Sequence, residues 1–233
     1  MAEKVVNQFN LVDEKWIPVA NHGLTSLSDI FSQKQFTALG GNPIQKIALT
    51  KLLLAIAQAA YTPKDDEDWK RLGMKGMAEK SLSYLNEKKD CFWLYGEKPF
   101  LQMPAIKDAA KQSFGAVSAS VATGNTTVLL QSQVEQEKTD AEKALLIVEL
   151  GNFALGGKKT DNTVVLTKGY SGKNNDKGKP GTGKPGPSLG FLGFLHSFLV
   201  GSTVLESMWL NLLTKEQISS TPHLTNGNGL APW

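Results

Sequence analysis

The sequence FNLVDEKWIPV, from Phe9 to Val19, combines apolar residues, a tryptophan and a proline in one short stretch. Its apolar residues lie on either side of a charged triplet, which predicts two short strands with a turn at 13–15. Pro18 cannot donate a backbone hydrogen bond, so it belongs at a sheet edge or a bulge. The stretch therefore predicts a hairpin at the edge of a hydrophobic core.

The composition is typical of a globular protein. Of the 233 residues, 41% are hydrophobic and 20% are charged, which allows one large domain or two small ones. Cys91 is the single cysteine, so an intramolecular disulfide and a cysteine-based zinc cluster are excluded, and its aromatic neighbours predict a buried thiol. The longest apolar stretch, 189–200, falls short of the ~20 residues that cross a bilayer. We therefore expect a cytoplasmic protein without a membrane partner.

Capping signals predict most of the helices. A helix is predicted over 43–61, because Asn42 is a favourable N-cap and Gln45 can complete a capping box. Its body is apolar on most faces, so it should be buried. The acidic cluster 65–68 marks another helix start, where carboxylates favour the positive end of the helix dipole. Further helices are expected over 74–88, over 140–150 and from Ser202 or Thr203 onwards.

Strand signals are shorter than the helical ones. The stretch CFWLYGEKPFLQMP is rich in aromatic residues on both sides of Gly96 and predicts a second hairpin. The longest region without a helix or strand signal is 152–188. Together these patterns predict an α+β fold, with mixed helices, short antiparallel strands and long irregular loops.

No residue pattern indicates catalysis. Gly178–Lys184 matches the glycine and lysine part of a phosphate-binding Walker loop, but Pro185 stands where a serine or threonine would bind magnesium. The three histidines lack partners at metal-ligand spacing, and no serine lies in a nucleophile elbow. We therefore assign no catalytic residue, no metal site and no cofactor.

One basic region stands out from the modest net charge of +3. From 156 to 190 the chain has seven lysines and two aspartates, a local charge of +5. At its start, Gly156 and Gly157 allow a close approach of the backbone, and Lys158 and Lys159 suit a phosphate. The alternative is a helix terminator followed by a solvated basic turn. A second candidate segment, 124–134, has small polar residues around an apolar centre, and it can equally be a strand with a polar end.

Several blocks, taken in order, resemble CasA, the large subunit of the type I-E CRISPR surveillance complex called Cascade. The opening pattern is the first of them. The others are 47–68, KPFLQMP at 98–104, 125–157 and STVLESMWLNLL at 202–213. The resemblance covers most of the chain. It implies that 1–233 is the N-terminal α+β domain of a Cascade large subunit, and that the C-terminal helical bundle of the longer CasA chains is absent from this one.

The resemblance also implies a function. The CasA subunit is not a nuclease; it recognises the protospacer-adjacent motif of duplex DNA through the minor groove, helps to open the duplex and provides the platform for a helicase-nuclease. By position, Gly156 and Gly157 match the family's glycine loop at the motif. We add Lys158 and Lys159 to this candidate DNA-binding site because of their positive charge. In the family, another loop docks on the 5′ handle of the guide crRNA, beside other Cascade subunits. The segment at that position here is Val128, Leu129, Leu130 and Gln131.

Two other classes of function remain open from the sequence. The first is an enzyme that holds a phosphorylated small molecule in the glycine and lysine loop. The second is an assembly module that contacts sibling subunits without touching DNA.

Overall fold

The computed structural model describes residues 6–102, 113–117, 137–153 and 196–221. Helices dominate this part of the chain, and the strands are short and antiparallel, which confirms the predicted α+β class. The elements are, in order, β1 (Gln8–Asn10), β2 (Ile17–Val19), β3 (Gly23–Thr25), α1 (Leu27–Ser32), α2 (Pro43–Ala60), α3 (Asp66–Glu87), η1 (Lys89–Cys91), β4 (Trp93–Tyr95), α4 (Phe114–Val117), α5 (Asp140–Asn152), α6 (Val204–Leu210) and α7 (Lys215–Ser220).

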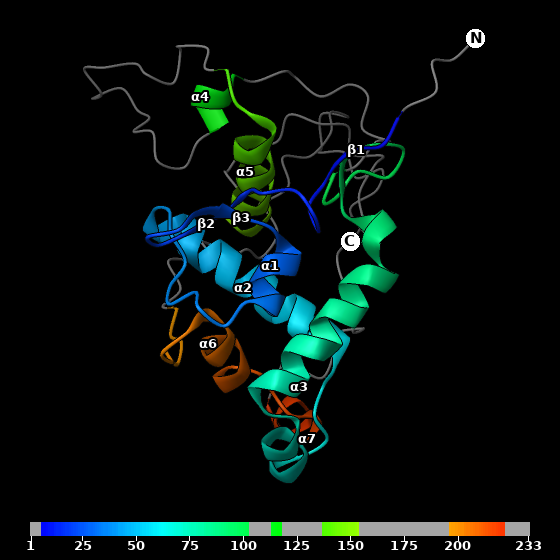
Figure 1. Ribbon diagram of the computed structural model, residues 1–233, viewed down its shortest axis with the longest axis vertical. Coiled ribbons are helices and arrows are strands. Elements are labelled where there is room, and N and C mark those ends of the chain that lie inside the picture. The colour runs from blue at the N-terminus through cyan, green and yellow to red at the C-terminus, as the bar shows by residue number, and fades with distance from the viewer. Residues whose placement is uncertain (1–5, 103–112, 118–136, 154–195, 222–233) are drawn as a thin grey trace, which may run out of the picture.

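Helix α2 lies at the centre of the molecule and packs against α3, α5 and α6. Figure 1 shows it crossing the middle of the view, with α5 above it and α6 below. Its predicted capping box is present, because Asn42 Oδ1 accepts from the Gln45 N–H and Gln45 Oε1 accepts from the Asn42 N–H, at 2.9 and 3.0 Å. The side chains that it buries are Ala48, Leu49, Leu52, Leu53, Ile56 and Ala57. The predicted buried helix is therefore confirmed.

The two strands of the opening stretch are confirmed, but the predicted hairpin between them is wrong. Strand β1 pairs with β4, and β2 pairs with β3, both antiparallel. The chain does turn between β1 and β2, where the N–H groups of Asp13 and Glu14 donate to the Asn10 C=O at 3.1 and 2.8 Å, but the two strands do not pair with each other. Leu11 and Trp16 are fully buried, and the Trp16 indole N–H donates to the Leu11 C=O at 2.9 Å. Pro18 lies in β2 opposite Leu24 of β3, and its C=O accepts from the Gly40 N–H at 2.8 Å, so the position uses the proline as an acceptor and needs no N–H donor.

Helix α3 joins the two helical segments that the sequence predicts. Asp65 caps its start by accepting from the Asp68 N–H at 2.9 Å. The helix breaks at Gly73, whose φ of 59° lies in the left-handed region that glycine tolerates. The first half packs against α6 through Trp69 and Trp209, whose rings stack with centroids 4.1 Å apart. Each indole N–H donates to the backbone C=O of the other tryptophan, at 3.0 and 3.3 Å.

The predicted hairpin at Gly96 is also wrong. The chain does turn there, and the Phe100 N–H returns to the Trp93 C=O at 2.8 Å, but the strand that pairs with β4 is β1. Phe92 and Phe100 are buried and stack on each other, so they hold the turn against the core without a second strand. Cys91 is half-buried, in contrast to the buried thiol expected from its neighbours.

We predict that Trp16→Ala destabilises the fold by about 3–5 kcal/mol, because it opens a large cavity in the core and removes the hydrogen bond to Leu11. Equilibrium urea unfolding measures this change. Leu24→Ala, in the neighbouring strand β3, is the control, because this side chain is exposed and its loss should change the free energy of unfolding by less than about 0.5 kcal/mol. Equal effects of the two substitutions would contradict the central role of Trp16.

Candidate nucleic-acid interface

Helix α5 leads directly into the segment with the predicted DNA-binding residues. The helix ends at Asn152, and Phe153 caps it by donating its N–H to the Glu149 C=O. Gly156, Gly157, Lys158 and Lys159 lie outside the described residues, as do the docking-loop residues Val128, Leu129, Leu130 and Gln131. The Walker-like stretch 178–184 also lies outside them. The structure therefore shows how α5, the helix that leads to Gly156 and Gly157, is attached to the rest of the fold.

The N-terminal end of α5 is fixed to β4. The predicted capping box is present between Thr139 and Glu142. The Tyr95 hydroxyl donates to Asp140 Oδ1 at 2.6 Å, and Lys143 Nζ lies 3.3 Å from the same oxygen. The hydrogen bond from Tyr95, with the Lys143 ammonium beside it, lowers the pKa of Asp140. Burial and the same hydrogen bond raise the pKa of Tyr95.

The C-terminal end of α5 is fixed to the start of α2. Glu149 is 3% exposed, and Gln45 Nε2 donates to its Oε2 at 3.3 Å. Gln45 also completes the capping box of α2, so one side chain connects the first turn of α2 to the last turn of α5. Oε1 of Glu149 has no hydrogen-bond partner within the described part of the chain. Both ends of α5 are thus attached to the core by polar side chains.

The two residues that flank segment 154–195 lie together. The rings of Phe153 and His196 meet edge to face, with centroids 6.1 Å apart. The two described ends of this segment therefore lie side by side. Loops whose ends meet on a rigid scaffold are a frequent location for binding residues.

Two residues after His196, Phe198 contacts a basic residue of α2. Lys51 Nζ lies 5.0 Å from the centroid of the Phe198 ring. The ammonium group lies over the ring face, so this cation–π contact attaches the segment before α6 to α2. Sequence reasoning did not assign a binding role to Phe153, His196, Phe198 or Lys51, since only tertiary contacts bring them together. The one local signal in the sequence is that Phe194 and Phe198 stand two residues before and two residues after His196, within an apolar run.

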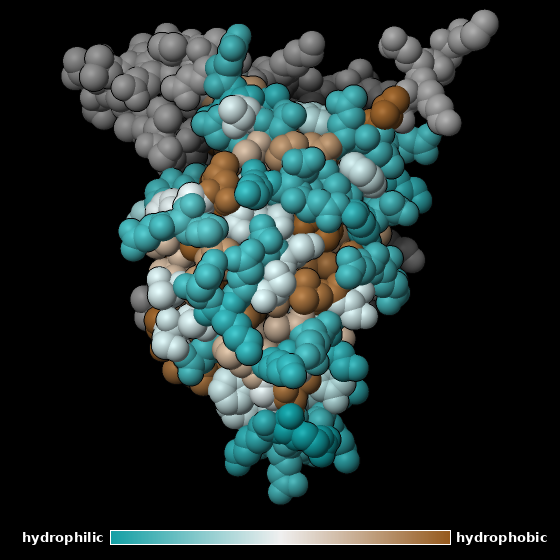
Figure 2. Space-filling view, viewed as in Figure 1, coloured by the Kyte–Doolittle hydropathy of each residue, from teal (hydrophilic) through white to brown (hydrophobic). Residues whose placement is uncertain are grey.

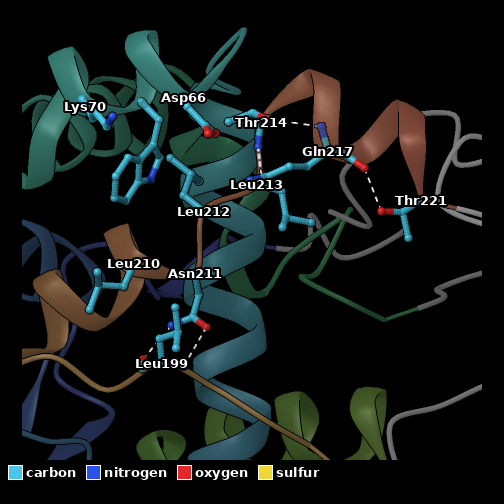
Figure 3. Close-up of a pocket in the computed structure, with 11 residues that line it drawn as sticks. Asp66, Lys70, Leu199, Leu210, Asn211, Leu212, Leu213, Thr214, Gln217 and Thr221 are labelled. Atoms are coloured by element: carbon cyan, nitrogen blue, oxygen red, sulfur yellow. Dashed lines mark hydrogen bonds between the residues drawn. The ribbon is translucent and has the colours of Figure 1, made fainter.

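A hollow of about 590 Å³ lies at the opposite end of α2, between the start of α3 and the α6–α7 connection. Figure 3 shows Asp66 and Lys70 at its upper rim and Leu199 and Asn211 below. Its other described lining residues are apolar, hydroxyl or amide groups. No group of three or more potential metal-binding side chains occurs in the described ranges. Among the described helices, none has the length and apolar character required to span a membrane.

Comparison with known proteins identifies the class of this fold. A family model described as CRISPR-associated protein Cse1 matches residues 10–233. The CasA/Cse1 protein of Thermus thermophilus is 30% identical over 166 residues, which is 65% of this chain and 33% of that protein. The crystal structure of Thermobifida fusca Cse1 has a TM-score of 0.67 at 26% identity, and the match covers 88% of this chain and 39% of that one.

A chain from a CRISPR RNA-guided surveillance complex has a TM-score of 0.65 at 17% identity, which shows the shared fold; it covers 89% of this chain and 44% of that chain. The family match over residues 10–233 places the chain among CRISPR-associated proteins. The chain belongs to the Cse1 family, also called CasA, which confirms the resemblance seen in the sequence. The chain spans about a third of the length of the curated relative.

We predict that Tyr95→Phe lowers the stability by about 1 kcal/mol near neutral pH, because Asp140 loses a hydrogen bond. The pKa of Asp140 is lowered in the folded protein, so its contribution is complete above the ordinary value of about 3.9 and is lost as the pH falls through the folded-state pKa. The difference between variant and parent should therefore shrink below about pH 4. Thermal unfolding across this pH range measures it.

Asn152→Ala is the control for this prediction. It removes a neutral hydrogen bond to the Val148 C=O in the same helix, so its effect should not change with pH between neutral and acid. A difference between Tyr95→Phe and the parent that is equally independent of pH would show that the Asp140 carboxylate is not the group involved.

Proposed function

We propose that this chain is a non-catalytic subunit of an RNA-guided DNA surveillance complex of the Cascade type, and that Gly156–Lys159 contacts the protospacer-adjacent motif of target DNA. The observation that carries the proposal is the closure of Phe153 on His196 behind an α5 that is fixed at both ends. This scaffold holds the origin of a glycine and lysine segment in a Cse1-family chain. Binding residues need such a rigid base to keep their geometry.

The residue types suit the floor and the walls of a minor groove. The minor groove is narrow and deep, so a side-chain-free backbone at Gly156 and Gly157 can approach the base edges. Lys158 and Lys159 supply positive charge for the phosphates on either side, which strengthens binding without reading sequence. This division of labour leaves the longer sequence to pairing between the guide RNA and the target strand.

The proposal extends to the partners of the complex. Val128, Leu129, Leu130 and Gln131 would dock on the 5′ handle of the guide crRNA and on neighbouring Cascade subunits. Likeness to a chain of a surveillance complex supports this arrangement at the level of the fold. Support of R-loop formation and recruitment of the helicase-nuclease are proposed for the assembly as a whole, because the chain spans only part of its relatives. The complex would act in the cytoplasm, where its DNA and RNA partners are.

We predict that Gly156→Val with Gly157→Val reduces the affinity of the reconstituted complex for motif-bearing duplex DNA by roughly tenfold or more, because branched side chains keep the backbone away from the base edges. Affinity for motif-free duplex should change little. Gel-shift titrations of both duplexes measure the ratio. Gly151→Ala, in the last turn of α5 where an added Cβ makes an ordinary contact with Leu101, is the matched glycine control. An unchanged ratio would place motif recognition elsewhere.

We predict a different effect for Lys158→Ala with Lys159→Ala. Binding should weaken to both duplexes, and the slope of log affinity against log salt should fall by about 2 if both lysines neutralise phosphates. The control is Lys15→Ala with Lys34→Ala, two lysines of the described N-terminal part. Normal assembly with unchanged DNA binding and salt slope would favour the pure assembly module. Turnover of ATP by the isolated chain would favour the enzyme that acts on a phosphorylated small molecule.

A further inference from the structure

The segment that precedes α6 is held in place by side chains of that helix and of the residue that caps its end. Asn211 makes two hydrogen bonds with the backbone of Leu199: its Oδ1 accepts from the Leu199 N–H at 3.0 Å, and its Nδ2 donates to the Leu199 C=O at 2.7 Å. Figure 3 shows this pairing. The Gly201 N–H donates to Ser207 Oγ at 3.0 Å, and the Ser202 N–H donates to the Glu206 carboxylate. The segment is thus fixed at three places.

This fixed segment presents aliphatic side chains to solvent. Leu199 is 61% exposed and Val200 is 83% exposed. Leaving such side chains in water is unfavourable, by roughly 1.5–3 kcal/mol relative to full burial. Figure 2 shows apolar surface at the left edge of the view, beside the position that α6 has in Figure 1. A backbone that is already ordered would lose little further entropy when a partner covers these side chains.

A hollow of about 200 Å³ adjoins the exposed pair, between α2 and α6. Its apolar lining includes Phe198, Val200 and Met208, and Leu199 lines both this hollow and the larger one of Figure 3. The two hollows and the exposed pair together form what we call the α6 edge. A hollow next to projecting aliphatic groups fits the core of a protein interface, in which apolar side chains of two partners interlock.

The charges at this hollow have one sign. Lys46 lines it, and Lys51 lies 5.0 Å from the ring of Phe198, which also lines it. Its described lining residues include no aspartate or glutamate. A partner that matches this surface has an apolar side chain for the hollow and a carboxylate for Lys46. Complementary charge of this kind steers association and fixes the orientation of the partner.

We propose that the α6 edge is a docking site for a protein segment that inserts an apolar side chain between Phe198 and Met208 and places a carboxylate at Lys46. Polynucleotides gain most of their affinity from several phosphate contacts and leave aliphatic groups uncovered. The exposed pair of Leu199 and Val200 therefore favours a protein partner. The α6 edge is separate from Gly156–Lys159. The first test below uses the reconstituted surveillance complex, so it rests on the proposed function.

The first test is site-specific photocrosslinking in the reconstituted complex. A photoreactive residue replaces Val200, which is exposed enough to tolerate it, and the same residue replaces Val6, which is 64% exposed, as the control. Crosslinking from position 200 to an acidic, apolar stretch of a protein is the expected result. Crosslinking to guide RNA or target DNA, or crosslinking no stronger than from position 6, overturns the proposal. Failure of the unmodified chain to enter the complex counts against the proposed function instead.

The second test uses the free chain and does not depend on the complex. NMR titration with a short peptide of alternating glutamate and leucine should shift the methyl signals of Val200 and Met208. Lys46→Glu and Val200→Glu should each weaken this binding by roughly tenfold, as expected for a central contact. Lys15→Glu and Val6→Glu are the matched controls and should leave it unchanged. Equal losses in all four variants, or stronger binding of oligouridylate RNA at the same methyl groups, would overturn the docking site.

Discussion

The need to cover α2 on several sides constrains most of the described structure. This helix is apolar around most of its circumference, and its partners are the next helix, α3, and two helices from distant parts of the sequence, α5 and α6. Burial of apolar area is the main favourable term in folding, and it has no preferred direction. Polar contacts such as the one between Gln45 and Glu149 therefore fix where each partner helix lies along α2.

The candidate interface follows from this arrangement. Helix α5 packs against α2, and its two ends are attached through hydrogen bonds from Tyr95 and Gln45. The chain that leaves α5 at Phe153 returns at His196, beside the segment that is held at Leu199. The described segment 196–200 thus connects the base of the glycine and lysine segment to the α6 edge. Recognition of nucleic acid and of protein would then depend on neighbouring parts of one scaffold.

The sequence predicted the features that depend on neighbours in the chain. The caps at Asn42 and Thr139 were located correctly, because a capping box involves residues three positions apart. Strand pairing was wrong in both predicted hairpins, since β1 pairs with a strand as distant in sequence as β4 and no local pattern specifies that choice. The contact of Phe153 with His196 was not predictable for the same reason. Gly156–Lys159 and Val128–Gln131 lie outside the described residues, so their roles remain proposals.

The reciprocal pairing of Trp69 and Trp209 has a consequence for how the chain acquires its structure. The two indoles are 140 residues apart in sequence, yet each satisfies the other's backbone. During synthesis, which proceeds from the N-terminus, the first half of α3 emerges long before its partner. Trp69 therefore lacks this stacking partner until Trp209 has been synthesised. Chaperones that bind exposed aromatic surface would find this indole available until the final closure.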